Sequence, residues 1–470
     1  MDQERFREYG HRFVDWLADY MKEIEAYPVM SRVKPGDIKR QLPAEPPQKA
    51  ERLDLIFADF QKIILPGITH WQHPGWFAYF PANNSPASVL AELLTAGLGA
   101  QCMSWQTSPA ATELEETVLD WLRSMMGLPE GLAGVIQDTA STATLCALLT
   151  AREKATDFGA NRSGLRDPLT VYASTETHSS IEKDVKIAGF GRENLHLIPV
   201  DEHFALIPAR LEEAVLEDMH RGLLPCCVVA TLGTTSSTAV DPLRPIGQVC
   251  RRHGMWLHVD AAFAGTAAVL PEMRWMLDGI EFADSIVFNP HKWMLTNFDC
   301  SAYFVRDPDL LKRTFEIRPE YLRTGQDALV KNYRDWGIPL GRRFRALKLW
   351  FVIRSYGVEG IQAMVREHLR LARLFESWVS AEPGFEILAP VNLSLVCFRW
   401  NDGRKSEAEL AALNKDLMDR VNATGRVFLT HTILKDRFTL RLAIGQRTTQ
   451  ERHVRLAWDL LRSEAEKLAT

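Results

Sequence analysis

The chain has 470 residues, of which 46% are hydrophobic and 24% are charged, and its formal net charge is −5. This composition is typical of a soluble globular protein, and a chain of this length is expected to form two or three domains. The small negative charge excludes an electrostatic reason to expect a nucleic acid or a membrane as partner. The sequence also contains no run of about 18 apolar residues that would span a bilayer.

The seven cysteines are odd in number and irregularly spaced. This pattern fits reduced thiols in a cytoplasmic protein better than a set of disulfides. The charged N-terminus lacks the apolar core of a secretory signal, which agrees with a cytoplasmic location. No C-x-x-C pair occurs, so a structural zinc site is not expected.

Residues 1–85 are expected to form a helical N-terminal arm that takes part in a dimer. Aromatic and apolar residues recur every three or four positions, which predicts an amphipathic helix: Phe6, Tyr9, Phe13, Trp16, Tyr20 and Ile24. A proline-rich link, 27–47, separates this helix from the rest of the chain. Because no local core is evident, the aromatic face is expected to pack on another surface, either of a partner subunit or of its own chain.

Apolar runs alternate with helical patterns over residues 86–350, which predicts a large α/β domain with a mostly parallel central sheet. The clearest strands are hydrophobic throughout, as strands buried on both faces are: 134–137, 169–173, 227–232, 255–260 and 284–289. Residues 351–470 begin with a long helix, continue with strands at 393–400 and 437–443, and end in a charged helix. They are expected to form a smaller α+β domain.

Unusual residues follow four of these strands, and an open α/β sheet binds ligands beyond the carboxyl ends of its strands. Thr139, Ala140 and Ser141 begin a helix, where they would form a phosphate site or simply cap the helix. The hydroxyl cluster after 227–232 fits either a turn or a ligand site. Lys292 follows the last strand, and this stretch alone favours a solvent-exposed lysine.

Asp260 ends the strand 255–260, and His258 shares its face. A carboxylate at the end of a buried strand requires a strong partner. A metal site of His253, His258 and Asp260 is one alternative, although no metal motif such as H-E-x-x-H is present. A lysine amine, a buried carboxylate and a phosphate site are together the contacts that pyridoxal phosphate requires. Lys292 would form the imine, and Asp260 would keep the pyridine nitrogen protonated so that the ring accepts electrons.

Several motifs in chain order resemble the pyridoxal-phosphate-dependent aromatic-L-amino-acid decarboxylases of group II and fold type I: S-P-A-A-T-E-L-E, A-T-L-G-T-T-S, W-L-H-V-D-A-A-F-A-G, N-P-H-K-W and I-P-L-G-R-R-F-R. The likeness extends from H-P-G-W-F-A-Y-F-P to R-L-A-I-G-Q-R-T. The resemblance implies pyridoxal 5'-phosphate as cofactor, a small amino acid as substrate, and a homodimer with shared active sites. It also reverses the interpretation of Lys292, which becomes the lysine that binds the cofactor.

The resemblance further assigns residues around the cofactor. It places in the phosphate region Ala140, Ser141, Ser285 and His291. It places around the ring Thr235, Asp260 and Ala262, while Asn289 precedes the lysine turn and His178 stacks on the cofactor face. The sequence D-T-A-S stands where some members have G-S-A-S, so Asp138 is expected to point away from the phosphate.

The implied reaction is decarboxylation of aromatic L-amino acids, of the tryptophan, tyrosine, phenylalanine, Dopa or 5-hydroxytryptophan type, to arylalkylamines. Tyr321 aligns with the tyrosine of a mobile catalytic loop and is the candidate acid for Cα, although spacing alone also fits a loop tyrosine without a role. The polar segment 316–330 is expected to be that lid. Alternatives are a histidine or acidic amino acid decarboxylase or an aromatic aldehyde synthase of the same family, and a metal-dependent hydrolase. The presence of both Tyr321 and His178 favours the decarboxylase.

The resemblance also implies a substrate pocket, formed by Trp71, Tyr79, Phe80, Pro81, Gln101, Met103 and Gly341, with 101–105 reaching across from the partner subunit. Without the resemblance, the aromatic residues of 71–81 would be read as core. Gly341 stands where similar histidine decarboxylases have serine, which leaves room for a phenol, catechol or indole. The neighbouring Arg342, Arg343 and Arg345 would fit an acidic substrate, but surface or subunit contacts are the favoured interpretation.

Overall fold

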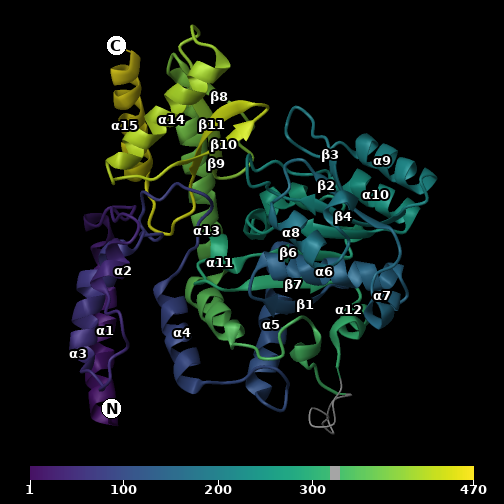
Figure 1. The fold of residues 1–470 in the computed structure, drawn as a ribbon, viewed down its shortest axis with the longest axis horizontal. Coiled ribbons are helices and arrows are strands. Elements are labelled where there is room, and N and C mark those ends of the chain that lie inside the picture. Colours follow the sequence, from purple (N-terminus) through teal and green to yellow (C-terminus); the bar gives the residue numbers. More distant parts are fainter. Residues whose placement is uncertain (318–328, 470) are drawn as a thin grey trace.

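The computed structural model describes residues 1–317 and 329–469. Within these residues a seven-stranded sheet has the order β1-β7-β6-β5-β4-β2-β3 (Figure 1). The strands are β1 (Ala133–Gln137), β2 (Leu169–Ser174), β3 (Leu195–Ile198), β4 (Leu224–Thr231), β5 (Trp256–Asp260), β6 (Ser285–Phe288) and β7 (Ser301–Val305). β7 is antiparallel to both of its neighbours, and the pairs from β6 to β3 are parallel. The predicted mostly parallel α/β sheet is therefore confirmed.

Strand residues point alternately into two hydrophobic cores, one on each face of the sheet. In β5, Leu257 and Val259 belong to one core and Trp256 belongs to the other. The helices that cover the first face are α5 (Pro109–Met126), α9 (Pro208–His220) and α10 (Leu243–His253). Those on the second face are α6 (Ala140–Ala155), α8 (Ser180–Ile187) and α12 (Pro308–Phe315), with the short α7 (Gly159–Ser163) beyond α6. Burial on both faces explains why these strands are apolar throughout.

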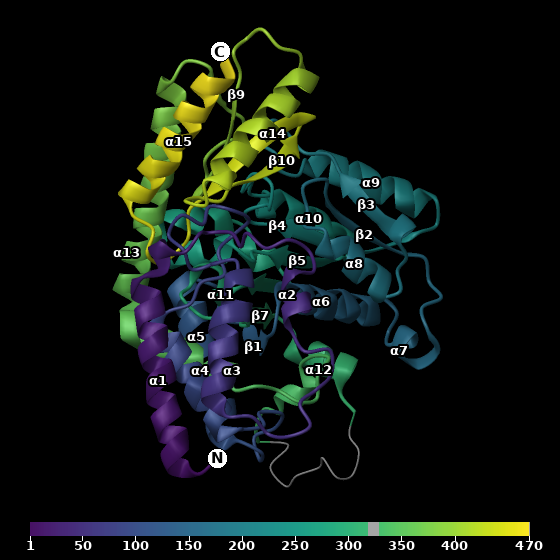
Figure 2. The ribbon, with the colours of Figure 1, turned by 60° about the vertical axis from the view of Figure 1, so that its left-hand side comes forward.

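A second, antiparallel sheet of the described chain has the order β10-β11-β9-β8. Its strands are β8 (Phe385–Ile387), β9 (Leu395–Trp400), β10 (Thr430–Leu434) and β11 (Arg437–Ala443), and its helices are α14 (Glu407–Ala423) and α15 (Glu451–Ala469). The long α13 (Arg345–Ala381) joins the two sheets, and Figure 2 shows it beside α15. Leu349 and Ile353 of α13 pack in the large core, whereas Leu371 and Phe375 pack in the small one. The predicted boundary at residue 350 thus falls inside α13, seven residues before the kink at Gly357, whose φ is +64°.

The N-terminal helices are α1 (Gln3–Lys22), α2 (Asp37–Gln41), α3 (Leu53–Asp59) and α4 (Pro86–Leu98). The aromatic face of α1 packs on α3 and the turn after it, and both views draw α1 and α3 side by side. The ring centroids of Phe13 and Phe57 are 4.7 Å apart, and those of Trp16 and Phe60 are 5.3 Å apart. No residue of α1 is fully buried, and Phe6 keeps 67% of its surface exposed. The arm therefore packs on its own chain and still presents apolar surface.

Two further features of the described residues bear on the sequence-based expectations. None of their helices combines the length and the apolar character that crossing a membrane requires. All seven cysteines are free and buried.

Candidate active site

A cavity of about 230 Å³ lies where the parallel strands of the large sheet end. Its lining contains the last residue of β4, the last residue of β5 and the residues that follow β6: Phe80, Thr139, Ala140, Ser141, His178, Ser180, Thr231, Gly233, Thr235, Asp260, Ala262, Phe263, Asn289, His291 and Lys292. A larger cavity, of about 750 Å³, is lined by residues of the segment 25–32 and of α15, but no lysine lines it. The smaller cavity is the candidate active site because it brings the predicted amine and carboxylate together.

Lys292 lies in α11 (Pro290–Trp293), a single turn that follows β6. Its Nζ atom is 5.6 Å from the centroid of the Phe80 ring. Within residues 1–317 and 329–469, no ion pair involves this amine. Burial lowers the pKa of Lys292, and the nearby Asp260 carboxylate opposes that effect. A buried amine with a lowered pKa is more often neutral and therefore a better nucleophile.

Asp260, the last residue of β5, keeps 6% of its surface exposed. Its Oδ1 atom accepts the backbone N–H of Ala262 at 3.0 Å. In the part of the chain that the structure describes, no arginine, lysine or histidine forms an ion pair with it. A buried carboxylate without a cation is costly, so the site is suited to a ligand that brings a protonated nitrogen.

The start of α6 provides the part of the cavity that suits an anion. Thr139 is the N-cap residue, and its side chain accepts the N–H of Thr142 at 3.3 Å. Ala140 and Ser141 form the first turn, whose N–H groups have no acceptor within the helix. Thr139, Ala140 and Ser141 line the cavity. The free N–H groups of this turn, the Ser141 hydroxyl and the positive end of the helix dipole all favour an anion there. The cavity therefore offers a phosphate site in addition to an amine and a carboxylate.

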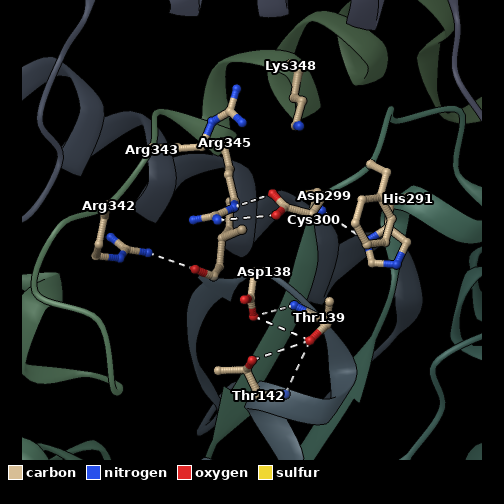
Figure 3. A network of polar contacts seen from close by, with 12 residues as sticks. Asp138, Thr139, Thr142, His291, Asp299, Cys300, Arg342, Arg343, Arg345 and Lys348 are labelled. Atoms are coloured by element: carbon tan, nitrogen blue, oxygen red, sulfur yellow. Dashed lines mark hydrogen bonds and ion pairs between the residues drawn. The ribbon is translucent and has the colours of Figure 1, made fainter. Parts of the chain in front are cut away.

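Asp138 precedes this helix and does not line the cavity. Its Oδ1 atom accepts the N–H of Thr139 at 2.6 Å, as Figure 3 shows. The same figure shows Arg345 paired with Asp299, at an Nε to Oδ1 distance of 2.8 Å. The Asp138 carboxylate is thus used in capping the turn, and the expectation that it points away from the phosphate region agrees with this geometry.

His291 is buried beside the amine and lines the cavity. Its Nδ1 atom accepts the N–H of Cys300 at 2.9 Å. Burial, reinforced by the charge of Lys292, lowers the pKa of His291 to about 3, so the ring is neutral and carries its proton on Nε2. Asn289, also buried in the lining, accepts the hydroxyl of Ser301 at 2.6 Å and donates its backbone N–H to Ala262. Both side chains are therefore held by hydrogen bonds from the start of β7, at Cys300 and Ser301.

His178 lies between β2 and α8, with its exposed ring in the cavity lining. Its Nδ1 atom accepts the backbone N–H of Ser180 at 3.1 Å. In the neutral ring Nδ1 is therefore unprotonated, and Nε2 carries the proton. Burial by neighbouring groups lowers the pKa of His178, which favours this neutral form. The ring can donate a hydrogen bond from Nε2 while Ser180 holds its orientation.

Ser285, which the resemblance places in the phosphate region, does not line the cavity. Its hydroxyl accepts the Trp256 indole N–H at 2.9 Å and contacts His258 Nδ1 at 2.8 Å. His258 Nε2 in turn lies 3.0 Å from the Thr144 hydroxyl.

The three residues of the metal alternative do not form a site. Both ring nitrogens of His258 are hydrogen-bonded, and the ring of His253 lies 3.8 Å from Glu212. The three ligands of the metal alternative do not converge, and the described residues contain no cluster of three or more such side chains.

The predicted substrate residues are only partly brought together in this chain. Phe80 lines the cavity and stacks on Phe263 with ring centroids 4.0 Å apart. The remaining predicted residues are absent from the lining: Trp71, Tyr79, Pro81, Gln101, Met103 and Gly341. Gln101 and Gly341 do lie together, since a Cβ on Gly341 would be 3.2 Å from Gln101 Nε2. Tyr321 and most of the predicted lid lie outside the described residues.

The structure also adds lining residues that the sequence analysis did not single out. Gly233 has a φ of +78°, and a Cβ there would meet the Cβ of Ala264 at 2.7 Å. A glycine is therefore required for the chain to turn beneath the cavity. The signal was present in A-T-L-G-T-T, where a glycine directly follows a buried strand. Phe263 and Ser180 gave no such signal, because their role depends on packing.

Comparison with known proteins agrees with this geometry. Residues 35–401 match the family model described as the pyridoxal-dependent decarboxylase conserved domain. Tryptophan decarboxylase 2 of Oryza sativa subsp. japonica is 47% identical over all of this chain and 96% of its own length. Phenylacetaldehyde synthase of Arabidopsis thaliana is likewise 47% identical, over all of this chain and 97% of its own length.

Solved structures extend the likeness to the fold. The crystal structure of Oryza sativa TDC with PLP and tryptamine superposes with a TM-score of 0.96 at 39% identity, covering 100% of this chain and 99% of that one. A 4-hydroxyphenylacetaldehyde synthase of Rhodiola rosea superposes with a TM-score of 0.93 at 38% identity, with full coverage of both chains. The family model matches residues 35–401, and relatives are 47% identical over the whole chain. The charged groups and the helix start of the cavity fit the cofactor. The chain therefore belongs to the pyridoxal-dependent decarboxylase family.

Proposed function

We propose that this decarboxylase acts on aromatic L-amino acids and releases the corresponding arylalkylamines. The observation that carries the proposal is the pair Lys292 and Asp260, an amine and a carboxylate without ion-pair partners in the described residues, facing one cavity whose wall includes the stacked rings of Phe80 and Phe263. The names of the relatives described above support the aromatic class of substrate. Within that class the individual substrate is open, because one hydroxyl in an apolar pocket changes binding by only about 1–3 kcal/mol.

Pyridoxal phosphate, when bound, supplies a protonated pyridine ring that accepts the electrons left at Cα after CO₂ departs. Lys292 would hold the cofactor through its amine, and Asp260 would keep the ring nitrogen protonated because a nearby carboxylate favours the cationic form. The start of α6, with Ala140 and Ser141, and the neutral His291 would hold the phosphate. Each of these side chains lines the cavity described above.

The remaining assigned residues would surround the ring. His178 would pack on one face, held by Ser180, and would present its Nε2 proton to the substrate side. Thr235, Ala262 and Asn289 line the same cavity and would bound the ring edge. Tyr321 is proposed as the acid that delivers a proton to Cα, on the strength of its alignment alone. His178 is the next candidate for that step, because its ring lines the cavity that contains Lys292 and its Nε2 atom carries a proton.

We further infer that the enzyme is a homodimer whose active sites are completed across the interface. Four leucines on one side of α4 are about half exposed or more: Leu90, Leu93, Leu94 and Leu98. Such an apolar helix face, together with the exposed end of the N-terminal arm, suits an obligate interface. The predicted substrate residues at 101–103 follow α4 directly, so an interface there would deliver them to a partner's cavity. The free cysteines support a cytoplasmic location.

A panel of CO₂-release assays tests the proposed substrate class. The purified enzyme, loaded with pyridoxal phosphate, is incubated separately with tryptophan, tyrosine, phenylalanine, Dopa, 5-hydroxytryptophan, histidine and glutamate. Turnover should be confined to one or more of the aromatic substrates. Faster release from histidine or glutamate than from every aromatic substrate would overturn the proposal.

Aromatic aldehyde synthesis is a second candidate activity, because the chain is as similar to a phenylacetaldehyde synthase as to tryptophan decarboxylase 2. The two outcomes differ in their products under air. A decarboxylase forms the amine and CO₂, whereas the synthase forms the aldehyde, CO₂, ammonia and hydrogen peroxide from the same substrate, water and O₂. We expect amine without peroxide, because Tyr321 is available as the Cα acid. Stoichiometric peroxide would assign the chain to the synthases.

A further inference from the structure

Arg441, in β11, is a buried cation that no carboxylate of the described chain neutralises. It keeps 3% of its surface exposed. The other deeply buried arginines described here pair with acids, as Arg342 does with Glu115 at 2.6 Å and Arg399 does with Glu386 and Glu407. A guanidinium buried without a carboxylate requires other acceptors, because burying an unpaired charge is costly. The identity of these acceptors indicates what Arg441 does.

The carbonyl acceptors of Arg441 belong to two segments that border the active-site cavity. Its Nη2 atom donates to the carbonyl of Thr235 at 2.7 Å, and its Nε atom donates to the carbonyl of Ser236 at 3.2 Å. The same Nη2 atom is 3.5 Å from the carbonyl of Tyr79. Thr235 lines the cavity, and Tyr79 directly precedes Phe80, which lines it as well. One planar group therefore holds together chain segments that are about 150 residues apart, a geometry that the rigid fork of arginine permits.

Thr430, the residue opposite Arg441 in the neighbouring strand, completes this arrangement. Its Oγ1 atom accepts Arg441 Nη1 at 3.1 Å and the backbone N–H of Tyr79 at 3.2 Å. Tyr79 has a φ of +51°, in the left-handed region that non-glycine residues seldom adopt. Because both its N–H and its carbonyl are bound from the small sheet, this conformation is maintained from outside the segment. The turn at Tyr79 directs the next residue, Phe80, toward the cavity.

The turn 233–238 is attached to the small sheet by further contacts. Cys397 Sγ is 3.3 Å from the Ser236 carbonyl, and the Thr432 hydroxyl is 3.3 Å from the Ser236 hydroxyl. Arg441 also lies over the Phe80 ring, with Cζ 5.5 Å from its centroid, and Lys292 contacts that same ring. The small sheet thus reaches the cavity wall through Arg441 and its neighbours.

We propose that Arg441 is a positioning residue that holds the turn 233–238 and the segment 77–80 in place. The position of the small sheet relative to these two segments then determines the shape of the active-site cavity. It acts through these two segments and not as a ligand, since its donors are directed to carbonyl and hydroxyl oxygens. The inference rests on the proposed location of the active site. Its structural part is nevertheless measurable without any turnover.

Amide hydrogen exchange of the holoenzyme tests the proposal directly. In Arg441→Met the amides of 77–80 and 233–238 should exchange at least tenfold faster, because both segments lose their shared anchor. The matched control is Arg399→Gln, which removes an equally buried arginine from the adjacent strand β9 and lies among the acids Glu386 and Glu407. The control should leave exchange in both segments unchanged even if it lowers the melting temperature. Unchanged exchange in Arg441→Met would overturn the proposal.

Arg441→Lys separates geometry from charge. Lysine keeps the positive charge but cannot bond two segments with a planar fork. We expect Arg441→Lys to bind pyridoxal phosphate at least fivefold more weakly than the parent by absorbance titration, and to raise KM for the preferred substrate more than it lowers kcat. Parental cofactor affinity and KM in Arg441→Lys would show that charge alone suffices and would overturn the positioning role.

Thr430→Val tests the same set of contacts if the arginine variants fail to fold. This conservative change removes the Oγ1 acceptor of Tyr79 and of Arg441 Nη1, while leaving the bonds to Thr235 and Ser236. Exchange should then rise at 77–80 and stay parental at 233–238. Equal effects on both segments, or none on either, would contradict the proposed arrangement. Failure of the CO₂-release panel with these exchange results intact would instead refute only the proposed substrate class.

Discussion

Asp184 should make the protein less stable at pH 8 than at pH 5, and replacing it with asparagine should remove that loss of stability. Asp184 lies in α8 with 2% of its surface exposed, between the core residues Ile181 and Val185. Its Oδ2 atom has no hydrogen-bond partner among the described residues. Burial raises the pKa of this carboxyl from 3.8 to about 7, against a smaller effect of Lys183 and with a contribution from Asp260.

The sign and size of the effect follow from proton binding in the two states. The folded pKa lies above the unfolded one, so near neutral pH the folded state retains a proton that the unfolded chain has lost. Stability therefore falls as pH rises above about 4 and levels off above about 7. At about 1.4 kcal/mol for each pH unit, the loss between pH 5 and pH 7 is about 3 kcal/mol. Asparagine does not titrate, so Asp184→Asn should lack this pH-dependent loss. Burying the amide can lower its stability, but it does so equally at every pH.

Urea unfolding of the holoenzyme at pH 5, 6, 7 and 8, at one protein concentration, measures the difference. Glu182→Gln is the matched control, because Glu182 lies in the same helix but is exposed and pairs with Lys186 at the surface. That control should change stability by less than about 1 kcal/mol and leave the pH dependence unaltered. If Asp184→Asn and the parent lose the same free energy between pH 5 and pH 8, the carboxyl does not bind its proton as described, and the reasoning is refuted.

Four further predictions concern the reaction and the assembly. Lys292→Ala should lose turnover and the visible absorbance of the bound cofactor without unfolding, and appreciable amine formation would remove its assignment. Asp260→Ala should weaken cofactor binding and slow the reaction, because the ring nitrogen loses the carboxylate that keeps it protonated; equal affinity and rate would contradict this role. Tyr321→Phe should lower the rate of amine formation by about 10²-fold or more and yield arylacetaldehyde with peroxide, and parental amine formation without peroxide would move the acid role to His178. Leu94→Glu in α4 should shift sedimentation from dimer to monomer, since burying an unpaired charge at an interface costs several kcal/mol, and an unchanged dimer would relocate the interface.

Local pattern was sufficient for the elements that are buried on both faces. The runs at 134–137, 169–173 and 255–260 agree with β1, β2 and β5 to within one residue at each end. Such strands are apolar at every position, so their signal does not depend on knowing which face is covered. The exception among these elements is β7, which was not identified although it too is buried throughout. The shorter β3 was also missed, because it is an edge strand and only partly buried.

The sequence by itself also predicted where the candidate site lies, since Asp260 ends a strand, Lys292 and the start of α6 each follow one, and strand ends converge on one edge of a parallel sheet. Only the tertiary structure showed the contacts of side chains away from that edge, as of Ser285, the first residue of β6, whose hydroxyl contacts Trp256 and His258. It also decided the role of Arg441, whose acceptors lie about 200 and 360 residues earlier in the chain. The succession of strands along the chain follows from local sequence, but the partner of a buried polar group depends on which distant segment packs beside it, and no local pattern carries that information.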